Sequence, residues 1–475
     1  MTLGPSSHVM ILGGGITGLA TAYYLQKARP DVRYTLVEQS SRLGGKVTTT
    51  RENGFVIEGG PDSFITDKPW ALQLCRDLGL EDRLIPSNRE SQKVYLLRHG
   101  KLVQYPGGLR LAVPTKIHPF LKSQILSNAG KFRMLGDLFI PRRESREDES
   151  LASFIQRRFG HECLDRLAGP LMGGIYVSDP KTMSMESTFP SFIQLEREHR
   201  SLILGMKAAA KKRSVGRNPA SAPPAMFMSL QGGMQELIEA LVTQLKGTLK
   251  TSTFAKSVRR SQSRFLVELE THHRAIPVSA THVVVTLPAW EAARVLEPAH
   301  WAMCDMLQDI RYVSTATASL AYQASDLPQG FELDGFGVLI PEVENRRLIA
   351  CTWSSTKFAG RAPEGKVLMR AFVGGNRHEA DAELPDDELL ELVRDEFKDL
   401  FKLEAPPMAH HISRWLHANP QYDVGHRERV DIIDRYAAEV PGLHIAGSAY
   451  RGIGLPDCIH GAIKTVEAMT GTALP

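Results

Sequence analysis

Residues 9–25 read VMILGGGITGLATAYYL, which is a short apolar run, a cluster of glycines and then a helical pattern. The apolar run predicts a buried parallel strand, and the residues after the glycines predict a helix with one inward face. Such a strand, turn and helix bind a dinucleotide when glycines allow a tight turn, close approach to a pyrophosphate and close packing. Three glycines fit that G-x-G-x-x-G pattern: Gly13, Gly15 and Gly18.

A second strand is predicted over residues 34–38, and it ends at Glu38, 20 residues after the third glycine. A carboxylate at this place accepts hydrogen bonds from a ribose, and it favours a ribose without phosphate. Residues 41–46 then read SRLGGK. The second glycine pair lets the backbone pass close to a ligand, and Arg42 and Lys46 are placed to meet the charge of a diphosphate.

Composition and charge narrow the class of protein. The chain has 475 residues, enough for two or three domains, and its net charge of +4 is no signature of nucleic-acid binding. Its five cysteines are widely spaced and form no C-x-x-C pair, which favours reduced thiols in a cytoplasmic protein and disfavours a metal site. The sequence has neither an apolar run near the ~20 residues of a membrane span nor the basic start of a signal peptide.

The segment 41–46 resembles the R-x-G-G-[KR] motif that follows the ribose-binding glutamate in the amine oxidase and protoporphyrinogen oxidase superfamily of FAD-binding proteins. The resemblance extends over the whole chain. Residues 414–426, RWLHANPQYDVGH, resemble the protoporphyrinogen oxidase branch, and residues 443–459 resemble the segment that closes the flavin site. The sequence is similar to the bacterial porphyrinogen oxidases of haem biosynthesis, of the soluble Gram-positive type.

This resemblance implies a fold of mixed α/β and α+β class. A Rossmann-like FAD-binding domain would be interrupted by a substrate domain with a mixed sheet and by a helical domain that associates with membranes in the family. The expected boundaries are residues 1–64, 226–297 and 438–475 for the FAD domain, 65–110 and 298–437 for the substrate domain, and 111–225 for the helical domain.

FAD is the implied cofactor, bound without a covalent link, and no metal is expected. The glycine turns and the resemblance together predict these FAD-binding residues: Gly13, Gly14, Gly15, Ile16, Thr17, Gly18, Glu38, Gln39, Arg42, Gly45, Lys46, Gly60, Pro61, Asp62, Ser63, Val258, Trp415, Ile453, Gly454 and Leu455. For the last three, backbone N–H groups at a helix N-terminus would face the N1–C2=O edge of the flavin.

No catalytic side chain is predicted, because flavin N5 would accept the hydride. The resemblance implies three substrate-binding residues. Lys68 would meet a propionate, although from sequence alone it also fits an exposed lysine before a helix, whereas Ile175 and Phe372 would pack against the macrocycle.

The implied reaction is oxidation of a porphyrinogen by O₂ to the porphyrin, with release of hydrogen peroxide. Coproporphyrinogen III is the expected substrate, with protoporphyrinogen IX beside it. The alternatives are a flavin amine oxidase or carotenoid desaturase on the same frame, and a non-catalytic FAD scaffold for a haem-pathway assembly. A handover to the next haem-pathway enzyme and peripheral contact with the inner face of the cell membrane are further expectations.

Three segments carry expectations about local structure. Residues 116–143 have apolar residues at helical spacing with basic residues between them, which fits either core or a membrane surface. Residues 169–180 are predicted to form a glycine-rich turn. Residues 190–212 predict one long helix, which gives way to a surface loop over 208–224.

Overall fold

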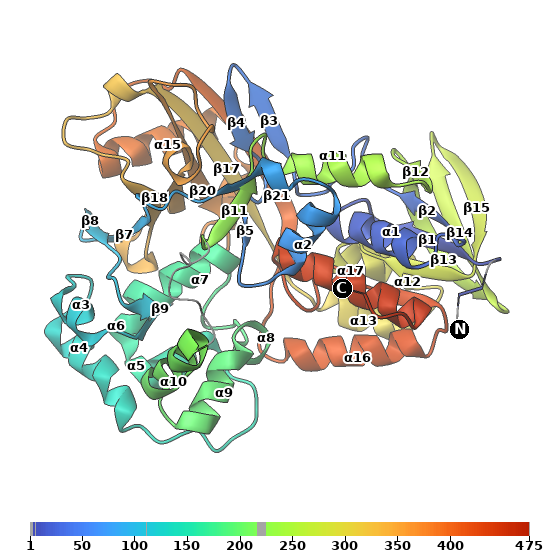
Figure 1. The fold of residues 1–475 in the computed structure, drawn as a ribbon, viewed down its shortest axis with the longest axis horizontal. Helices are drawn as coiled ribbons and strands as arrows, with labels where there is room; N and C mark the ends of the chain where they lie inside the picture. Colours follow the sequence, from blue (N-terminus) through green and yellow to red (C-terminus); the bar gives the residue numbers. More distant parts are fainter. Residues whose placement is uncertain (1–2, 5, 111, 216–224, 475) are drawn as a thin grey trace. The chain divides into compact units, whose positions relative to one another are not determined.

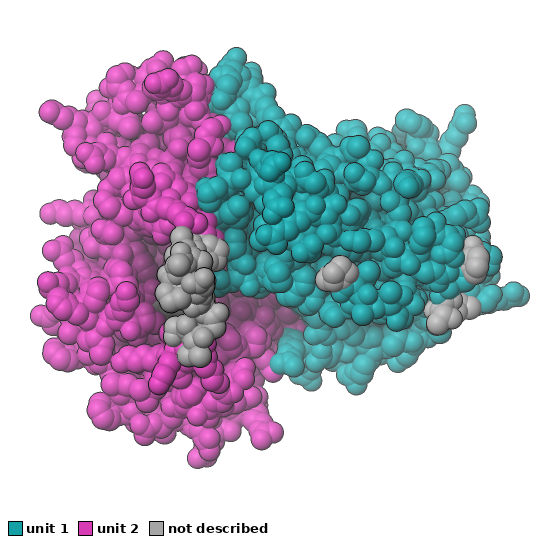
Figure 2. Space-filling model, in the orientation of Figure 1, with its two compact units in different colours: residues 1–86, 226–311, 427–475 teal, residues 87–225, 312–426 magenta. Residues whose placement is uncertain are grey.

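The computed structural model describes residues 3–4, 6–110, 112–215 and 225–474 (Figure 1). The chain forms two compact units (Figure 2). Unit 1 comprises residues 1–86, 226–311 and 427–475, and unit 2 comprises residues 87–225 and 312–426. Unit 1 is therefore assembled from three separate stretches of sequence, and unit 2 from two.

Unit 1 is organised around a parallel sheet of five strands in the order β12-β2-β1-β16-β22. The apolar run that begins at Val9 forms the central strand β1, as predicted, and its Leu12 is in register with Val37 and Val285. Strand β16, on the other side of β1, is buried at every residue. The carboxyl ends of parallel strands lie at one edge, so the turns after β1 and β2 come together there. The strands are β1 (His8–Leu12), β2 (Arg33–Val37), β12 (Thr248–Lys250), β16 (His282–Val285) and β22 (Leu443–Ile445).

Helices α1 and α17, from opposite ends of the chain, pack side by side in unit 1 (Figure 1). Their apolar residues share one core with residues of α2 and α11. The remaining strands form a meander, a hairpin and a three-stranded sheet. These elements are α1 (Ile16–Ala28), β3 (Thr49–Glu52), β4 (Phe55–Glu58), β5 (Phe64–Ile65), α2 (Trp70–Asp77), η1 (Glu81–Arg83), β6 (Leu84–Pro86), β11 (Phe227–Leu230), α11 (Gln235–Gln244), β13 (Phe254–Ser261), β14 (Arg264–Thr271), β15 (Arg274–Ala280), α12 (Ala289–Leu296), α13 (Trp301–Gln308), α16 (His426–Ala438) and α17 (Leu455–Thr470).

Unit 2 contains a mixed sheet of seven strands in the order β21-β17-β20-β19-β18-β7-β8. One face is apolar and shares a core with helix α15. Because side chains alternate along a strand, the other face carries the polar residues of β17, of which Thr317 and Ser319 are buried. The elements are β7 (Lys93–Arg98), β8 (Lys101–Gln104), β17 (Tyr312–Gln323), η4 (Ala324–Asp326), β18 (Gly335–Leu339), η5 (Glu342–Glu344), β19 (Leu348–Trp353), α14 (Ser354–Lys357), β20 (Lys366–Gly374), η6 (Glu379–Glu383), α15 (Asp386–Phe401) and β21 (Ala409–Pro420).

The helical part of unit 2 has its own core of buried apolar side chains. A fully buried ion pair joins Arg158 of α5 to Asp137, whose carboxylate also accepts from the hydroxyl of Ser201 at 2.5 Å. The elements are β9 (Leu109–Arg110), β10 (Val113–Pro114), α3 (Ile117–Lys122), α4 (Asn128–Leu135), η2 (Gly136–Leu138), α5 (Leu151–Phe159), α6 (His161–Cys163), η3 (Leu164–Ala168), α7 (Gly169–Tyr176), α8 (Met185–Thr188), α9 (Pro190–His199) and α10 (Leu202–Val215).

Two expectations about these helices were wrong. The long helix predicted over 190–212 is broken at Arg200, which has a φ of +64°, and the Ser201 hydroxyl accepts a hydrogen bond from the Leu204 N–H at 3.3 Å in the first turn of α10. Residues 169–176 form helix α7 rather than a turn, with Pro170 in its first turn, where a proline is tolerated. Helix α10 also occupies the start of the predicted loop, and residues 216–224 of that loop lie outside the described residues.

The amphipathic segment 116–143 lies partly in the core, and some of its apolar side chains are exposed. Phe120 and Met134 are buried in the helical core, whereas Phe132 and Phe139 are 70% and 81% exposed. Of the described residues, none belongs to a helix that is long and apolar enough to span a bilayer.

Candidate cofactor and active site

The turn between β1 and α1 packs so closely at Gly13 and Gly18 that a side chain is excluded from both positions. Gly13 has a φ of +109°, and a Cβ atom there would lie 2.7 Å from Thr286 Oγ1. A Cβ atom on Gly18 would lie 2.0 Å from the carbonyl oxygen of Gly13. Gly15 caps α1 without a side chain, and a Cβ atom there would meet nothing within 4 Å. The N-terminus of α1 therefore has the open space and N–H groups that bind a pyrophosphate.

Glu38 follows β2 and lies beside this turn, with Gln39 exposed after it. The Glu38 carboxylate accepts hydrogen bonds from the N–H groups of Gly14, at 2.8 Å, and Ser40, at 2.9 Å. Because each carboxylate oxygen has two lone pairs, these bonds leave capacity to accept from ribose hydroxyls. The geometry thus fits the predicted ribose-binding carboxylate.

The second glycine pair packs directly on the first turn. Gly44 donates its N–H to the carbonyl of Gly14 at 2.8 Å, and a Cβ atom on Gly45 would lie 3.1 Å from the Cα of Gly15. The guanidinium of Arg42 donates to the carbonyl of Gly45 at 2.5 Å, so it braces this loop. Two backbone segments therefore approach the same place, as the sequence predicted.

Lys46 directly follows this pair. Burial lowers the pKa of its ammonium from the ordinary 10.5 to about 8. An adjacent anion would favour the charged form and raise the pKa again, so the environment of Lys46 suits a partner such as a diphosphate.

The turn at residues 60–63 contacts the same loop. A Cβ atom on Gly60 would lie 1.8 Å from the carbonyl oxygen of Lys46, so only glycine fits there. Ser63 donates its hydroxyl to the carboxylate of Asp62 at 2.6 Å, and the Asp62 carbonyl accepts from the hydroxyl of Ser229 at 2.7 Å. Residues 60–63, with Pro61 between Gly60 and Asp62, therefore form a defined turn beside Lys46.

Helix α17 has the same kind of beginning as α1. Gly454 caps it without a side-chain hydrogen bond, and Leu455 and Pro456 open the helix. The loop before it contains Gly452, with a φ of +142°, and Ile453. This N-terminus again presents backbone N–H groups and no capping side chain.

The beginnings of α1 and α17 meet. The thiol of Cys458, in the first turns of α17, hydrogen-bonds with the side chain of Thr17, next to Ile16 in the first turn of α1, and Lys46 lies close enough to affect the same thiol. Burial raises the pKa of Cys458 to about 11, so the thiol is protonated and unreactive at neutral pH. The glycine turns from the two ends of the chain thus form one site, and its features fit a dinucleotide with a diphosphate.

The structure places the other predicted residues as follows. Val258 is fully buried in β13, in register with Val267 of β14. Lys68 lies between β5 and α2 of unit 1, where its ammonium binds both oxygens of Asp457 at 2.5 and 2.7 Å. Its side chain is still 41% exposed.

Three predicted residues belong to unit 2. Phe372 of β20 pairs with Thr317, and Trp415 of β21 pairs with Thr315, so both rings lie on the polar face of the seven-stranded sheet. Ile175 is 53% exposed on α7, a helix that contacts β18 and β19 of that sheet.

Arg370 is a residue that the sequence reasoning missed. It lies two positions before Phe372, so it shares the polar face, and its guanidinium is 4.9 Å from the centre of the Phe372 ring. It donates to the hydroxyl of Thr317 at 3.3 Å and is 4% exposed. The sequence could have indicated this residue, because Arg370 is a single arginine within the apolar run of β20, and a buried cation needs a specific environment.

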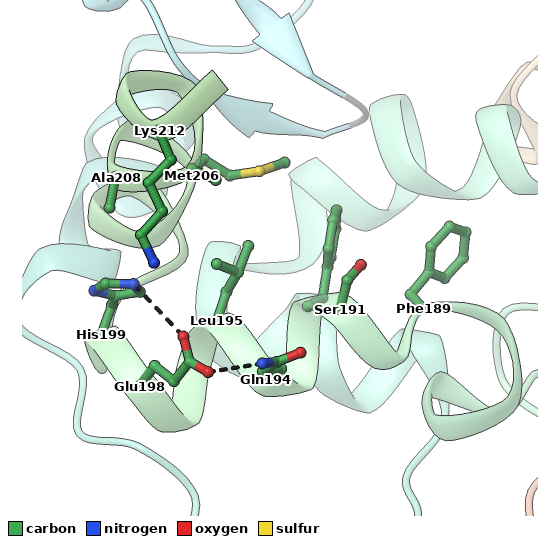
Figure 3. A pocket seen from close by; sticks show the side chains of 11 residues that line it. Phe189, Ser191, Gln194, Leu195, Glu198, His199, Met206, Ala208 and Lys212 are labelled. Carbon is green, nitrogen blue, oxygen red and sulfur yellow. Dashed lines mark hydrogen bonds and ion pairs between the residues drawn. The ribbon is translucent and has the colours of Figure 1, made fainter. Parts of the chain in front are cut away.

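A cavity of about 320 Å³ lies elsewhere in unit 2, between α9 and α10 (Figure 3). Its lining is largely apolar, and Glu198 is bound by Gln194 at 2.7 Å and lies 3.9 Å from His199. None of the predicted cofactor or substrate residues lines it. The part of the chain that the structure describes contains no group of three side chains suited to hold a metal ion.

Comparison with known proteins gives relatives along the full chain. The family described as flavin containing amine oxidoreductase matches residues 16–470. The coproporphyrinogen III oxidase of Bacillus subtilis (strain 168) is 36% identical over 470 residues, 98% of each chain. That of Propionibacterium freudenreichii subsp. freudenreichii is 36% identical over 98% of this chain and 91% of its own. A crystal structure from Exiguobacterium sp. 255-15, provisionally named as a protoporphyrinogen oxidase, is 31% identical, with a TM-score of 0.85 over 98% of both chains.

The fold and the paired glycine turns define an FAD-dependent oxidoreductase. The chain belongs to the flavin containing amine oxidoreductase family, which confirms the predicted fold class and cofactor. The predicted site residues and the boundaries of the three domains stay predictions.

Proposed function

We propose that this protein oxidises a porphyrinogen to the porphyrin in haem biosynthesis, with coproporphyrinogen III as its main substrate and O₂ as the electron acceptor. The observation that best supports FAD binding is that the N-termini of α1 and α17, each capped by a glycine, lie close together beside Lys46. Two relatives that match nearly the whole chain are named for coproporphyrinogen III, and they support this substrate.

The chemistry that bound FAD would supply is the acceptance of hydride from the macrocycle and its transfer to O₂, with release of hydrogen peroxide. Conversion of a porphyrinogen to a porphyrin removes six electrons and six protons, so three molecules of O₂ would be consumed. The chain itself binds and orients. The turns at Gly13 and Gly45 would hold the diphosphate, Glu38 would hold the ribose, and the backbone N–H at Gly454 would stabilise negative charge at the flavin edge.

The substrate would be positioned rather than activated by acid–base chemistry. We infer that Phe372 and Ile175 pack against the pyrrole rings and that Lys68 meets a propionate. Lys68 has three N–H donors and a partly exposed side chain, so its bonds to Asp457 leave capacity for a second carboxylate. Coproporphyrinogen has four propionates and protoporphyrinogen two, which favours the former at a cationic entrance.

The test is a comparison of substrates with the purified holoprotein. Anaerobic reduction of the bound flavin by coproporphyrinogen III, faster than by protoporphyrinogen IX, and peroxide release in air are expected. Reduction by amines or polyenes instead would establish the amine oxidase or desaturase alternative. A flavin that no porphyrinogen reduces, with no peroxide released, would favour the non-catalytic scaffold.

Cytoplasmic location with peripheral membrane contact is a further part of this proposal. Phe132 and Phe139 are the most exposed large apolar side chains of the segment 116–143, and Lys122 and Arg142 are exposed in the same segment. Aromatic side chains beside cations are typical of surfaces that bind anionic lipids.

Cosedimentation with anionic vesicles should be lost in a Phe132→Ser/Phe139→Ser variant, and equal binding by the wild type and this variant would contradict the membrane contact. Handover to the next haem-pathway enzyme would follow at such a surface.

A further inference from the structure

We propose that Asp457 is a positioning residue that, as an ion pair with Lys68, sets the charge at the beginning of α17 and thereby the reduction potential of the bound FAD. The proposal rests on the predicted placement of the flavin edge at this helix N-terminus. It does not depend on which substrate reduces the flavin.

The ion pair joins parts of unit 1 that are far apart in the sequence. Lys68 belongs to the short link between β5 and α2, and Asp457 lies in the first turn of α17. The ammonium is 2.5 Å from one carboxylate oxygen and 2.7 Å from the other. The side chain of Asp457 is 17% exposed, so its carboxylate is partly shielded from water.

A second contact fixes the same two segments together. The ring of Trp70 stacks on that of His460, with centroids 3.7 Å apart and planes inclined by 12°. Because residues three apart on a helix are neighbours, Asp457 and His460 lie on one face of α17. Residues 68–70 are therefore held against this face by one ionic and one stacking contact, which restricts where the ammonium can lie.

The carboxylate also supports the loop before α17. A Cβ atom on Gly452 would lie 2.5 Å from the Cβ of Asp457, and one on Gly454 would lie 3.2 Å from its Oδ2. Asp457 thus lies close to Gly452 and to Gly454, and the N–H group of Gly454 is one of the three that are predicted to face the flavin. A change in its charge acts at the place where the reduced flavin would gain negative charge.

The electrostatic consequence follows from the helix dipole. The N-terminus of α17 is a positive end that favours negative charge on a neighbouring group. A carboxylate in the first turn offsets this effect, and the ammonium of Lys68 cancels the carboxylate. The pair therefore leaves the helix end positive, whereas either partner alone would shift the potential in a direction given by its own charge.

The experiment is a dye-coupled anaerobic reduction of the holoprotein, without substrate, for four variants. Asp457→Asn leaves an unpaired ammonium and is expected to raise the equilibrium constant for reduction about threefold to tenfold, about 15 to 30 mV for a two-electron couple. Lys68→Met leaves an unpaired carboxylate and is expected to lower the equilibrium constant for reduction by a similar factor. The double variant should return close to the wild type. Lys464→Met breaks the pair with Glu467, 2.8 Å apart and further along α17, and should leave the potential unchanged.

The proposal would be overturned if both single variants shifted the reduction potential in the same direction. It would also be overturned if the equilibrium constant for reduction changed less than about twofold in both. Should a single variant fail to retain FAD, the conservative changes Lys68→Arg and Asp457→Glu keep both charges and must keep the wild-type potential. Turnover of porphyrinogen by the wild type is measured in a separate experiment. Unchanged potentials in the variants would therefore not contradict the proposed substrate, and a lack of turnover would not affect the interpretation of the potentials.

Discussion

His444 shows how a single residue of the central sheet makes unit 1 sensitive to pH. It lies in β22, and its ring is nearly parallel to that of His282 in β16, with centroids 6.2 Å apart. Burial, together with the neighbouring His282, lowers the pKa of His444 from 6.5 to about 4. The folded protein therefore resists protonation of this ring more than the unfolded chain does.

The sign of the effect follows from proton binding. As the pH falls below 6.5 the unfolded chain takes up the proton first, so the stability present at neutral pH is lost toward pH 4. We expect a loss of up to about 3 kcal/mol of unfolding free energy across this range. Urea unfolding at several pH values measures it, and His444→Leu should flatten this part of the profile. His410→Gln removes an exposed histidine and should not; equal profiles for all three proteins would contradict the expectation.

Sequence reasoning could predict where a residue lies when a local motif fixes its position, and it missed contacts between distant segments. The position of Glu38 beside the glycine turn was predictable, because one helix and one strand separate it from that turn. Asp457 was not, since it is 389 positions from the lysine that it binds. No pattern within either segment reports a contact at that separation.

At the beginning of helix α1, the fold tolerates a side chain at position 15, whereas the predicted FAD site does not. Gly15 has ordinary backbone angles, φ −72° and ψ 179°, and open space around its Cβ position. A methyl group there would be compatible with the fold but would occupy the space in which we expect the diphosphate to lie.

Gly15→Ala should therefore fold with a nearly unchanged melting temperature in the apo form and bind FAD at least tenfold more weakly. Flavin fluorescence titration and apo-protein melting measure the two quantities. Gly461→Ala is the matched control: it also has nothing within 4 Å, and inside α17 an alanine should stabilise the helix by about 0.5–1 kcal/mol with FAD affinity unchanged. Wild-type FAD affinity in Gly15→Ala would remove this turn from the cofactor site.

The helices show where periodicity suffices and where it fails. The helix predicted after Pro69 forms as α2 because its apolar positions match one buried face. The break between α9 and α10 escaped prediction because it depends on tertiary contacts. The Arg200 carbonyl accepts from buried Arg158 at 2.8 Å, and the Ser201 hydroxyl binds Asp137, so the chain is held in a turn that propensity alone does not favour.

For the whole molecule, FAD is expected to stabilise unit 1 selectively. A ligand that binds only the folded state stabilises it by about 2.7 kcal/mol at a hundredfold excess over its dissociation constant. Hydrogen exchange of apo- and holoprotein should show increased protection at residues 13–19, 44–47 and 452–458, whereas α9 and α10, around the cavity of Figure 3, serve as the internal reference. Equal protection in both sets of segments would contradict a cofactor site at the glycine turns.

The fold class and family could be predicted because the decisive motifs are short and lie in regular βα units. The assignment of strands to sheets could be predicted only in part. The parallel strands at the start and end of unit 1 have apolar runs, but the order β12-β2-β1-β16-β22 brings together strands separated by hundreds of residues. The seven-stranded sheet likewise adds β7 and β8 to strands from much later in the chain, a pairing without a local signal.

The order in which unit 1 is synthesised follows from its three-part composition. Strand β1 and the first glycine turn leave the ribosome early, whereas β22 and α17 emerge only after the whole of unit 2 has been synthesised. A nascent or truncated chain that ends before residue 455 would display the diphosphate turn without the segment that closes over the flavin. Flavin loading would then report that synthesis has passed α17, and chains that terminate before this helix would stay colourless and open to proteolysis.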